Sequence, residues 1–207
     1  MLYTRKGDGA TTKTLHCDQR FSKSLAVAEA LGAVDELNSL LGFVGIKCQG
    51  LTLIGKGESL PQGLTLKLVL GEVQQNLFIV QAELAGAPPR TQRGSRPQPF
   101  TISSNKVRAL EKIIDGIEQE LPPIKSFFVA GGTELGTLLD YARTVARRAE
   151  RRVVAATVAA TKSEVRGLVK IGPPSLAYLN RLSSLLYALA RLVNHQSGIN
   201  EQAPHYQ

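Results

Sequence analysis

Three arginines in the stretch from residue 127 to 154 recur at a spacing that could bind an anion. Arg143, Arg147 and Arg151 stand four residues apart, and this spacing places them on one ridge of a helix. Each planar guanidinium group can donate two parallel hydrogen bonds to a phosphate or a carboxylate, which a lysine cannot do. The pattern therefore indicates a phosphate or carboxylate site. A solvated helix face, stabilised by pairing with Glu150, is the alternative interpretation of the same residues.

A second candidate anion site lies near the N-terminus, in a loop of small residues. Residues 4–13 read Thr-Arg-Lys-Gly-Asp-Gly-Ala-Thr-Thr-Lys, with three cationic side chains and three hydroxyl groups. Gly7 and Gly9 allow backbone N–H groups to converge on a phosphate. The Walker A pattern Gly-x-x-x-x-Gly-Lys-Ser/Thr does not occur in the chain. A flexible basic N-terminus is the alternative interpretation of this loop.

Two acidic residues, Asp35 and Glu36, interrupt a stretch of apolar residues that recur at helical spacing. A carboxylate on the packing side of a helix requires a partner, because an unpaired buried charge is costly. If both side chains face solvent, no partner is needed. The pattern leaves both interpretations open.

The composition favours helices packed around an aliphatic core. The chain has 207 residues, no tryptophan, five tyrosines and six phenylalanines. Few runs of alternating β-branched residues occur, so strands are not expected. At this length we expect one domain spanning residues 1–207, made of an N-terminal loop (1–23), a helix bundle (24–197) and a tail (198–207).

Charge and cysteine content bound the expected partners and compartment. The net charge of +8 suits anionic partners in general, whether nucleotides, nucleic acid or an acidic surface. Cys17 and Cys48 lack the spacing of metal ligands, which favours a reducing compartment. No signal-peptide pattern is visible, and no apolar run reaches the roughly 18 residues that a membrane span requires. We therefore expect a cytoplasmic protein with no membrane partner.

Apolar residues at three- and four-residue steps predict five helices. Thr65 and Thr133 are the expected N-caps of the second and fourth. The intervening glycine-rich, proline-rich and polar stretches predict loops, and residues 195–207 are expected to form a frayed tail. The pattern indicates an all-α, five-helix up-and-down bundle. The expected helices span residues 24–48, 65–86, 104–120, 133–160 and 174–194, and the expected loops span 49–63, 88–99 and 161–172.

One face of a helix bundle offers no deep site. If Arg143, Arg147 and Asn180 act together with the N-terminal loop, we expect that loop to reach them from a neighbouring subunit. The sequence therefore predicts an oligomer.

Five stretches, in order along the chain, resemble the motifs of a known enzyme family. They are Thr4-Arg-Lys-Gly-Asp8, Gly32-Ala-Val-Asp-Glu-Leu-Asn-Ser39, Phe127 to Gly132, Ala142-Arg-Thr-Val-Ala-Arg-Arg-Ala-Glu-Arg-Arg152 and Tyr178-Leu-Asn-Arg-Leu-Ser183. Together they look like the successive motifs of the PduO-type ATP:cob(I)alamin (corrinoid) adenosyltransferases. The resemblance implies transfer of the 5′-deoxyadenosyl group of ATP to cob(I)alamin, with release of triphosphate. It also implies a homotrimer whose ATP and corrinoid sites lie between neighbouring subunits.

The resemblance further implies roles for individual residues. Phe127 corresponds to the family aromatic that presses on the corrinoid and keeps the lower axial position of cobalt empty. Asp35 corresponds to the acidic residue that pairs with Arg143 across the subunit interface. Arg147 would lie on the triphosphate leaving group, and Co(I) itself attacks the ribose C5′, so no protein base is expected. The implied catalytic residues are thus Phe127, Asp35, Arg143 and Arg147. The residues implied to bind ATP with Mg²⁺ are Thr4, Arg5, Lys6, Gly7, Asp8, Thr12, Lys13, Lys23, Arg147, Arg148, Glu150, Arg151 and Asn180.

Several positions depart from the family pattern. Ala10 stands where a second loop glycine is usual, and Asp140 replaces a frequent histidine. Val27, Ala130 and Ser184 stand where arginine, proline and aspartate are usual.

The resemblance also implies further partners. They are a flavoprotein reductase that supplies the electron and an adenosylcobalamin-dependent enzyme that receives the product. Two other functions stay open from sequence. One is a non-catalytic bundle that binds and delivers adenosylcobalamin. The other is a basic helical protein that binds nucleic acid, although the chain lacks a recognised nucleic-acid-binding motif.

Overall fold

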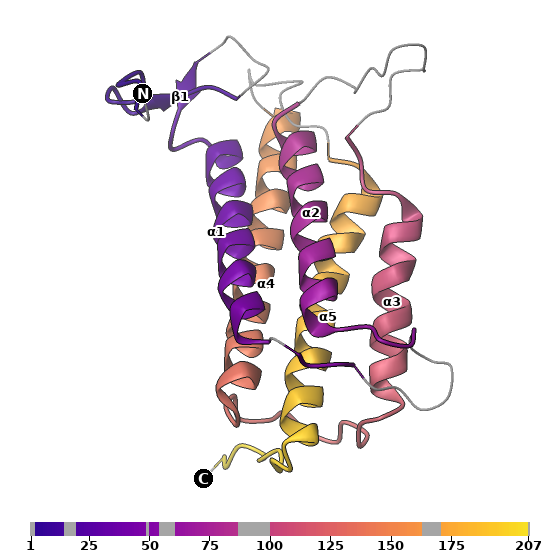
Figure 1. The fold of residues 1–207 in the computed structure, drawn as a ribbon. Coiled ribbons are helices and arrows are strands. Elements are labelled where there is room, and N and C mark those ends of the chain that lie inside the picture. Colours follow the sequence, from indigo (N-terminus) through magenta and orange to yellow (C-terminus); the bar gives the residue numbers. More distant parts are fainter. Residues whose placement is uncertain are drawn as a thin grey trace, which may run out of the picture.

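Five helices dominate the computed structural model, which describes residues 3–14, 20–48, 50–53, 61–86, 100–162 and 171–206. They are α1 (Ala26–Lys47), α2 (Leu66–Leu84), α3 (Ser104–Glu118), α4 (Glu134–Lys162) and α5 (Pro173–Gln196). Each helix runs opposite to the one before it in the sequence (Figure 1). The predicted all-α, five-helix up-and-down bundle is therefore confirmed.

Helix α4 lies at the centre of the packing. It contacts both α1 and α5, while α1 also packs against α2 and α5 against α3. The core between the helices is aliphatic, and Leu37, Leu139 and Leu182 are completely buried within it. Burial of each such leucine contributes about 1.5–3 kcal/mol relative to exposure. Because the apolar stripe of α4 faces this core, its arginines at positions 147, 148, 151 and 152 face solvent.

Side chains cap the starts of α4 and α5. At α4, the Thr133 hydroxyl accepts a hydrogen bond from the Gly136 backbone N–H at 2.9 Å, as predicted. At α5, the buried carboxylate of Glu83 accepts hydrogen bonds from the Gly172 backbone N–H at 2.6 Å and from the Ser175 hydroxyl. Because Glu83 belongs to α2, it joins the end of that helix to the start of α5. Satisfying these N–H groups removes a cost that a buried helix end would otherwise carry.

Two segments differ from the sequence predictions. A short antiparallel pair, β1 (Thr11–Thr12) with β2 (Phe21–Ser22), forms where no strand was predicted. Strands of two residues are too short to leave an alternating pattern in the sequence. The tail is not frayed, because α5 continues to Gln196 and the Val129 N–H donates to the Gln202 carbonyl at 2.8 Å.

Some predictions lie outside the described residues, including the proline-rich connector at 88–99 and Cys17. Cys48 is a buried free thiol, and its burial raises the pKa of the thiol. Thr65 caps α2 as predicted, accepting from the Leu68 backbone N–H at 3.3 Å. Within the described ranges, none of the helices combines the length and apolar character needed to cross a membrane.

Candidate active site

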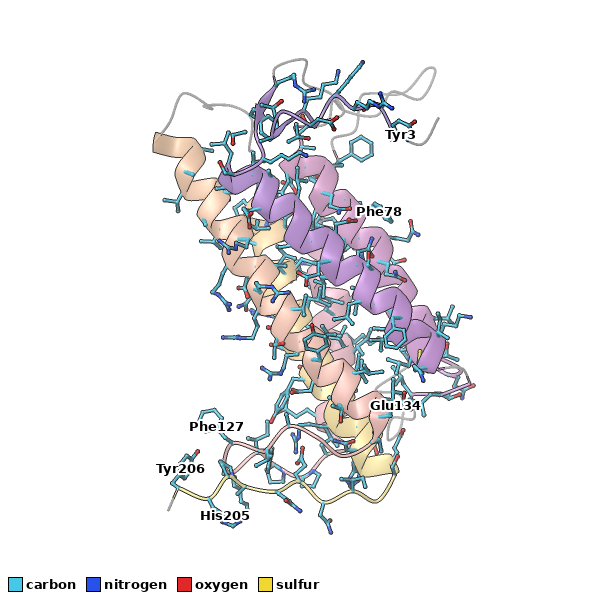
Figure 2. The ribbon with its side chains drawn as sticks, turned by 90° about the vertical axis from the view of Figure 1, so that its left-hand side faces the viewer. Tyr3, Phe78, Phe127, Glu134, His205 and Tyr206 are labelled. Carbon is cyan, nitrogen blue, oxygen red and sulfur yellow. The ribbon has the colours of Figure 1, made fainter. Side chains whose placement is uncertain are left out.

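A groove beside the loop that follows α3 gathers residues from three parts of the chain. It has a volume of about 740 Å³ and is bordered by residues 124–130, α4 and α5. Phe127 lies at its edge with 81% of its surface exposed. Figure 2 shows Phe127 projecting outward at one end of the bundle. A ring this exposed contributes little to the folding of a single chain and is available to cover a ligand.

Arg143 lines the same groove and is held by its own helix. Its Nε donates to Asp140 Oδ1 at 2.7 Å, and its guanidinium lies 5.9 Å from the centre of the Tyr187 ring. Burial raises the pKa of the Tyr187 hydroxyl, and the nearby charge of Arg191 acts in the opposite direction. The Asp140 departure from the family pattern therefore gives Arg143 a carboxylate partner within the same chain.

A smaller pocket of about 280 Å³ lies farther along α4, between Arg147, Glu150, Arg151 and Asn180. The Asn180 amide donates to Glu150 Oε1 at 3.0 Å, and Arg181 donates to Asn180 Oδ1 at 2.7 Å. The structure thus brings together four of the residues predicted to bind the nucleotide. The two guanidinium groups can bind an anion, and the Glu150 carboxylate can accept a further hydrogen bond. The pocket therefore suits an anionic ligand that also carries a hydrogen-bond donor.

Arg147 lines both of these cavities. Within the described part of the chain, neither Arg147 nor Arg151 forms an ion pair. Two neighbouring cations without a carboxylate partner repel one another, so an anionic ligand between them is favoured. This arrangement supports the anion-site interpretation of the arginine ridge over the alternative of pairing with Glu150.

Arg148 lies on a different side of α4. Its guanidinium pairs with Glu36 of α1 at 2.6 Å, and Arg152 lies 3.9 Å from Glu29 of the same helix. These residues border a third cavity, of about 420 Å³, between α1 and α4. Within one chain, Arg148 is therefore separated from Arg147 and Asn180, and its role in nucleotide binding stays a prediction.

Asp35 is exposed on α1, as one of the two sequence interpretations expected. Its Oδ1 accepts a weak hydrogen bond from the Gln81 amide at 3.4 Å, longer than is usual for such bonds. Arg143 has Asp140 as its partner in the same chain. The pairing of Asp35 with Arg143 across a subunit interface stays a prediction.

The N-terminal loop is shaped by two residues with left-handed backbone conformations. Arg5 and Ala10 have φ values of 54° and 56°. Lys23 closes the loop, because its N–H donates to the Ala10 carbonyl at 2.9 Å. Its ammonium group lies beside Gly7, where an added Cβ would come within 3.2 Å of Lys23 Nζ. The predicted phosphate loop and Lys23 therefore form one unit.

Arg20 stabilises this loop, and sequence reasoning missed it. Its guanidinium donates to the Lys6 carbonyl and, at 2.9 and 2.8 Å, to the hydroxyl and carbonyl oxygens of Thr11. Arg20 directly precedes β2, and the pairing of β2 with β1 brings it within reach of Thr11. Those strands were not predicted.

The N-terminal loop and the segment between α3 and α4 lie at opposite ends of the bundle (Figure 1), and Figure 2 shows Tyr3 and Phe127 at these two ends. The arginine ridge of α4 runs between them. One chain therefore does not place the loop against the Phe127 groove. A site that uses both requires a second copy of the chain, which agrees with the oligomer expected from the sequence.

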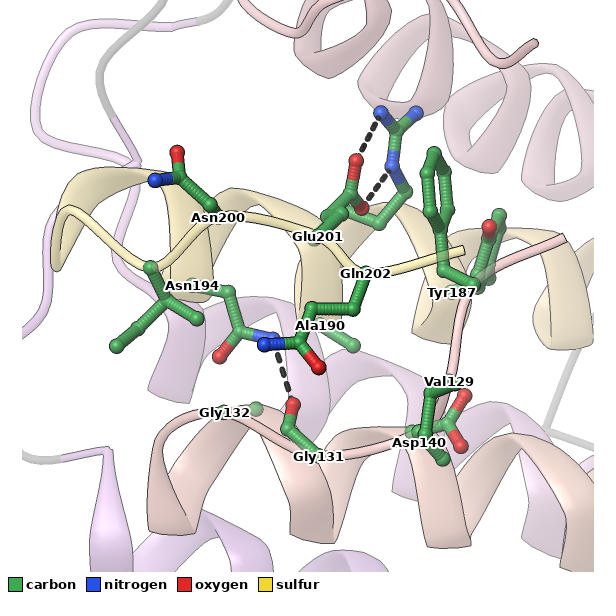
Figure 3. Close-up of a pocket in the computed structure, with 15 residues that line it drawn as sticks. Val129, Gly131, Gly132, Asp140, Tyr187, Ala190, Asn194, Asn200, Glu201 and Gln202 are labelled. Atoms are coloured by element: carbon green, nitrogen blue, oxygen red, sulfur yellow. Dashed lines mark hydrogen bonds and ion pairs between the residues drawn. The ribbon is translucent and has the colours of Figure 1, made fainter. Parts of the chain in front are cut away.

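Asn194 on α5 fixes the turn before α4, and it is a second residue that sequence reasoning missed. Its Oδ1 accepts hydrogen bonds from the N–H and the hydroxyl of Thr133 at 3.0 and 2.9 Å, and its Nδ2 donates to the Gly131 carbonyl at 2.8 Å (Figure 3). A Cβ on Gly132 would come within 2.6 Å of Asn194 Oδ1. Gly132 of the predicted turn therefore leaves room for this side chain.

Known proteins share the sequence pattern and the fold of this chain. The family model described as cobalamin adenosyltransferase matches residues 2–193. The chain belongs to the cobalamin adenosyltransferase family. It is 37% identical over 199 residues to the corrinoid adenosyltransferase PduO of Citrobacter freundii and 36% identical over 200 residues to the corrinoid adenosyltransferase of Bacillus subtilis. The matches cover 96% and 97% of this chain.

The chain spans about half of the Citrobacter freundii protein (51%) and most of the Bacillus subtilis one (90%). Among solved structures, a variant PduO-type ATP:corrinoid adenosyltransferase from Lactobacillus reuteri, complexed with cobalamin and ATP, is 29% identical. It aligns with a TM-score of 0.76 over 100% of this chain and 97% of its own. This chain therefore shares the fold of the solved cobalamin adenosyltransferase.

Proposed function

We propose that this protein transfers the 5′-deoxyadenosyl group of ATP to the cobalt of a reduced corrinoid. The observation that carries the proposal is the position of Arg147, which borders both the Phe127 groove and the pocket with Arg151 and Asn180. A nucleotide in the pocket and a corrinoid in the groove would meet at this residue. The relatives named above as corrinoid adenosyltransferases support the same activity.

The reaction is a displacement at the ribose C5′. An electron pair of Co(I) forms the Co–C5′ bond, the C5′–O bond breaks, and its electrons leave with the triphosphate. Negative charge grows on the triphosphate as the bond breaks, so guanidinium groups at Arg147 and Arg151 stabilise the transition state more than the ground state. Cobalt is the nucleophile, and the protein therefore supplies no general base.

Phe127 would act on the corrinoid. Its exposed ring at the edge of the groove can cover the lower axial face of the corrin and exclude a ligand from that side. Loss of a lower ligand removes electron donation to cobalt, which favours reduction of Co(II) to Co(I). Arg143 and Tyr187 border the same groove and would position the corrinoid.

The N-terminal loop would hold the triphosphate with Mg²⁺. The loop combines the cations of Arg5, Lys6 and Lys23 with threonine hydroxyls and one carboxylate, Asp8. This donor set fits a magnesium ion that binds mainly through phosphate oxygens and one protein carboxylate. When bound, Mg²⁺ would neutralise charge on the leaving group.

A homotrimer completes this proposal. The loop and the Phe127 groove lie at opposite ends of one chain, so the loop of one subunit would serve the arginine ridge of its neighbour. We place the enzyme in the cytoplasm, where a flavoprotein reductase would supply the electron and an adenosylcobalamin-dependent enzyme would receive the product.

The activity is tested by an anaerobic assay with ATP, Mg²⁺ and chemically reduced cob(I)alamin, following the absorbance of adenosylcobalamin. We expect turnover by the wild-type protein and a loss of about 10²–10³-fold in kcat for Arg147→Ala, as for removal of one transition-state donor. Arg152→Ala is the matched control, because Arg152 lies on the same helix but faces Glu29 of α1. Corrinoid binding without turnover would instead identify a carrier protein.

The shared site is tested by mixing two inactive variants. Lys23→Ala damages the loop and Arg147→Ala damages the ridge, so trimers of either variant alone contain no intact site. If each site takes its loop and its ridge from different subunits, mixed trimers regain some intact sites. Activity that stays absent after subunit exchange would show that both elements belong to one chain.

A further inference from the structure

The segment that follows α5 turns back across the loop that carries Phe127. Gly198, with a φ of 71°, adopts the left-handed conformation that ends a helix and reverses the chain. Four residues later, the Gln202 carbonyl accepts a hydrogen bond from the Val129 N–H at 2.8 Å. Residues 199–202 and 128–132 thus enclose a cavity of about 230 Å³ at the end of the bundle (Figure 3).

Arg191 on α5 joins these two segments. Its guanidinium donates to both carboxylate oxygens of Glu201, at 2.5 and 2.8 Å, and to the Pro122 carbonyl at 2.9 Å. The same group lies 5.4 Å from the centre of the Phe128 ring and 5.9 Å from that of Tyr187. One side chain therefore contacts the tail, both ends of the loop 122–128 and the wall of the groove.

The guanidinium group of Arg191 is buried and does not lie on the surface. Only 6% of Arg191 is exposed, and the side chain of Glu201 is 20% exposed. The hydrogen bond to Glu201 raises the pKa of Arg191, so this buried guanidinium keeps its positive charge. An unpaired buried charge is costly, so without Glu201 the Arg191 side chain would turn toward water or another anion. The residues that it contacts would then move with it.

The contacts of Arg191 affect the groove because Phe128, which Arg191 contacts, is adjacent in the chain to Phe127. Phe128, beneath the Arg191 charge, is the neighbour of Phe127, and Tyr187 lines the groove into which Phe127 would press a ligand. Phe127 itself makes few contacts, since 81% of its surface is exposed. Its position therefore depends on how firmly the adjacent backbone is held.

We propose that Arg191, locked by Glu201, is a positioning residue that fixes the 122–130 loop and thereby sets the placement of Phe127 over the corrinoid. This inference rests on the proposed function for its effect on corrinoid chemistry. The contacts of Arg191 with Glu201, Pro122 and Phe128, which we call the clamp, are a property of the folded chain and do not depend on that function. The C-terminal segment thus has a role in corrinoid binding and none in nucleotide binding, because none of its described residues (197–206) borders the pocket of Arg151 and Asn180.

The test compares the wild-type protein with Glu201→Gln, which keeps the side-chain shape but removes the charge. Glu72→Gln is the matched control, since Glu72 also pairs with a cation, Lys106, but between α2 and α3 and away from the groove. Three quantities are measured: the hydrogen-exchange rate of the Val129 amide, the KM values for corrinoid and for ATP, and the absorption spectrum of bound cob(II)alamin. Arg191→Lys is the second variant, used if Glu201→Gln does not fold.

We expect Glu201→Gln to exchange the Val129 amide at least tenfold faster and to raise the corrinoid KM at least fivefold. We expect the KM for ATP to change by less than twofold relative to the wild-type protein. The absorption bands of bound cob(II)alamin that lacks a lower ligand should become weaker. An unchanged Val129 exchange rate, or KM values that rise equally for both substrates, would overturn the proposal. If the wild-type protein shows no turnover, the proposed function fails, while the exchange rate and cob(II)alamin binding still test the clamp.

Discussion

The side-chain amide of Asn180 donates a hydrogen bond to the Glu150 carboxylate across 3.0 Å, joining α5 to α4 beside two arginines. Glu150 follows Arg147 by three residues, a spacing at which helix side chains are neighbours, so it could have neutralised that arginine. The contact with Asn180 directs the carboxylate elsewhere. Both guanidinium groups thus keep their capacity to bind the phosphates of a nucleotide.

This relationship predicts the effect of removing the amide. In Asn180→Ala, Glu150 is released to pair with Arg147, which then binds phosphate less well. A hydrogen bond to a charged group contributes about 1.5–3 kcal/mol, so the KM for ATP should rise by about tenfold or more. Asn105→Ala, which removes an exposed amide that pairs with Arg108 on α3, should leave this KM unchanged. An ATP KM equal to that of the wild-type protein in Asn180→Ala would contradict this role.

Ala10→Gly should tighten the N-terminal loop. Ala10 has a φ of 56°, and an L-residue other than glycine in the left-handed region is destabilised by about 1–2 kcal/mol. Glycine removes that strain, so the Lys23 amide, which donates to the Ala10 carbonyl, should exchange its hydrogen more slowly. We also expect a lower KM for ATP. Gly9→Ala is the control for the exchange measurement alone, because a Cβ there meets no described atom within 4 Å. Faster exchange at Lys23 in Ala10→Gly would show that the left-handed residue carries no strain.

Arg143 has two candidate carboxylate partners, and trimer stability distinguishes them. If Asp35 of a neighbouring subunit pairs with Arg143 in a buried interface, Asp35→Ala should weaken assembly by about 3–5 kcal/mol, the effect of breaking a buried pair. Asp140→Asn removes the partner in the same chain, 2.7 Å away, and should leave the trimer assembled. Sedimentation over a range of concentrations measures both effects. A trimer that is stable in Asp35→Ala but dissociates in Asp140→Asn would reverse the assignment.

Gly136→Ala should destabilise the protein, because the added Cβ would overlap the side chains of Asn194 and Thr133. Overpacking of this kind costs about 1–3 kcal/mol and would displace the turn that precedes α4. Thermal unfolding should therefore begin at a lower temperature. Gly71→Ala in α2 is the matched control, since a Cβ there has open space and alanine favours a helix by about 0.5–1 kcal/mol over glycine. Equal melting temperatures for the two variants would show that Asn194 moves away without cost.

The helices were predictable because each leaves a repeated local pattern. The apolar steps at Leu37, Ala142 and Leu182 predicted buried helix faces, and Thr133 in front of α4 predicted its cap. The grouping of Arg147 with Arg151 followed from their four-residue spacing. Such features depend on residues within one or two turns of each other.

Contacts between distant segments could not be predicted in the same way. Asn194 lies 61 residues from Thr133, and Glu201 reaches Arg191 only because Gly198 reverses the chain. No local pattern specifies either pairing, and the polar composition of the tail suggested a frayed end. Arg148 shows the limit within a helix: it stands next to Arg147 in the sequence but faces α1 and Glu36.

The most direct test of the central claim follows both products of a single turnover. Protein in excess over reduced cob(I)alamin is mixed with ATP and Mg²⁺ without oxygen, and adenosylcobalamin is measured by absorbance while the phosphorus products are resolved by ³¹P NMR. Attack of Co(I) on C5′ predicts one intact triphosphate released for each adenosylcobalamin formed. Release of phosphate or pyrophosphate without adenosylcobalamin, or bound corrinoid with unreacted ATP, would contradict the assignment of this chain as an adenosyltransferase.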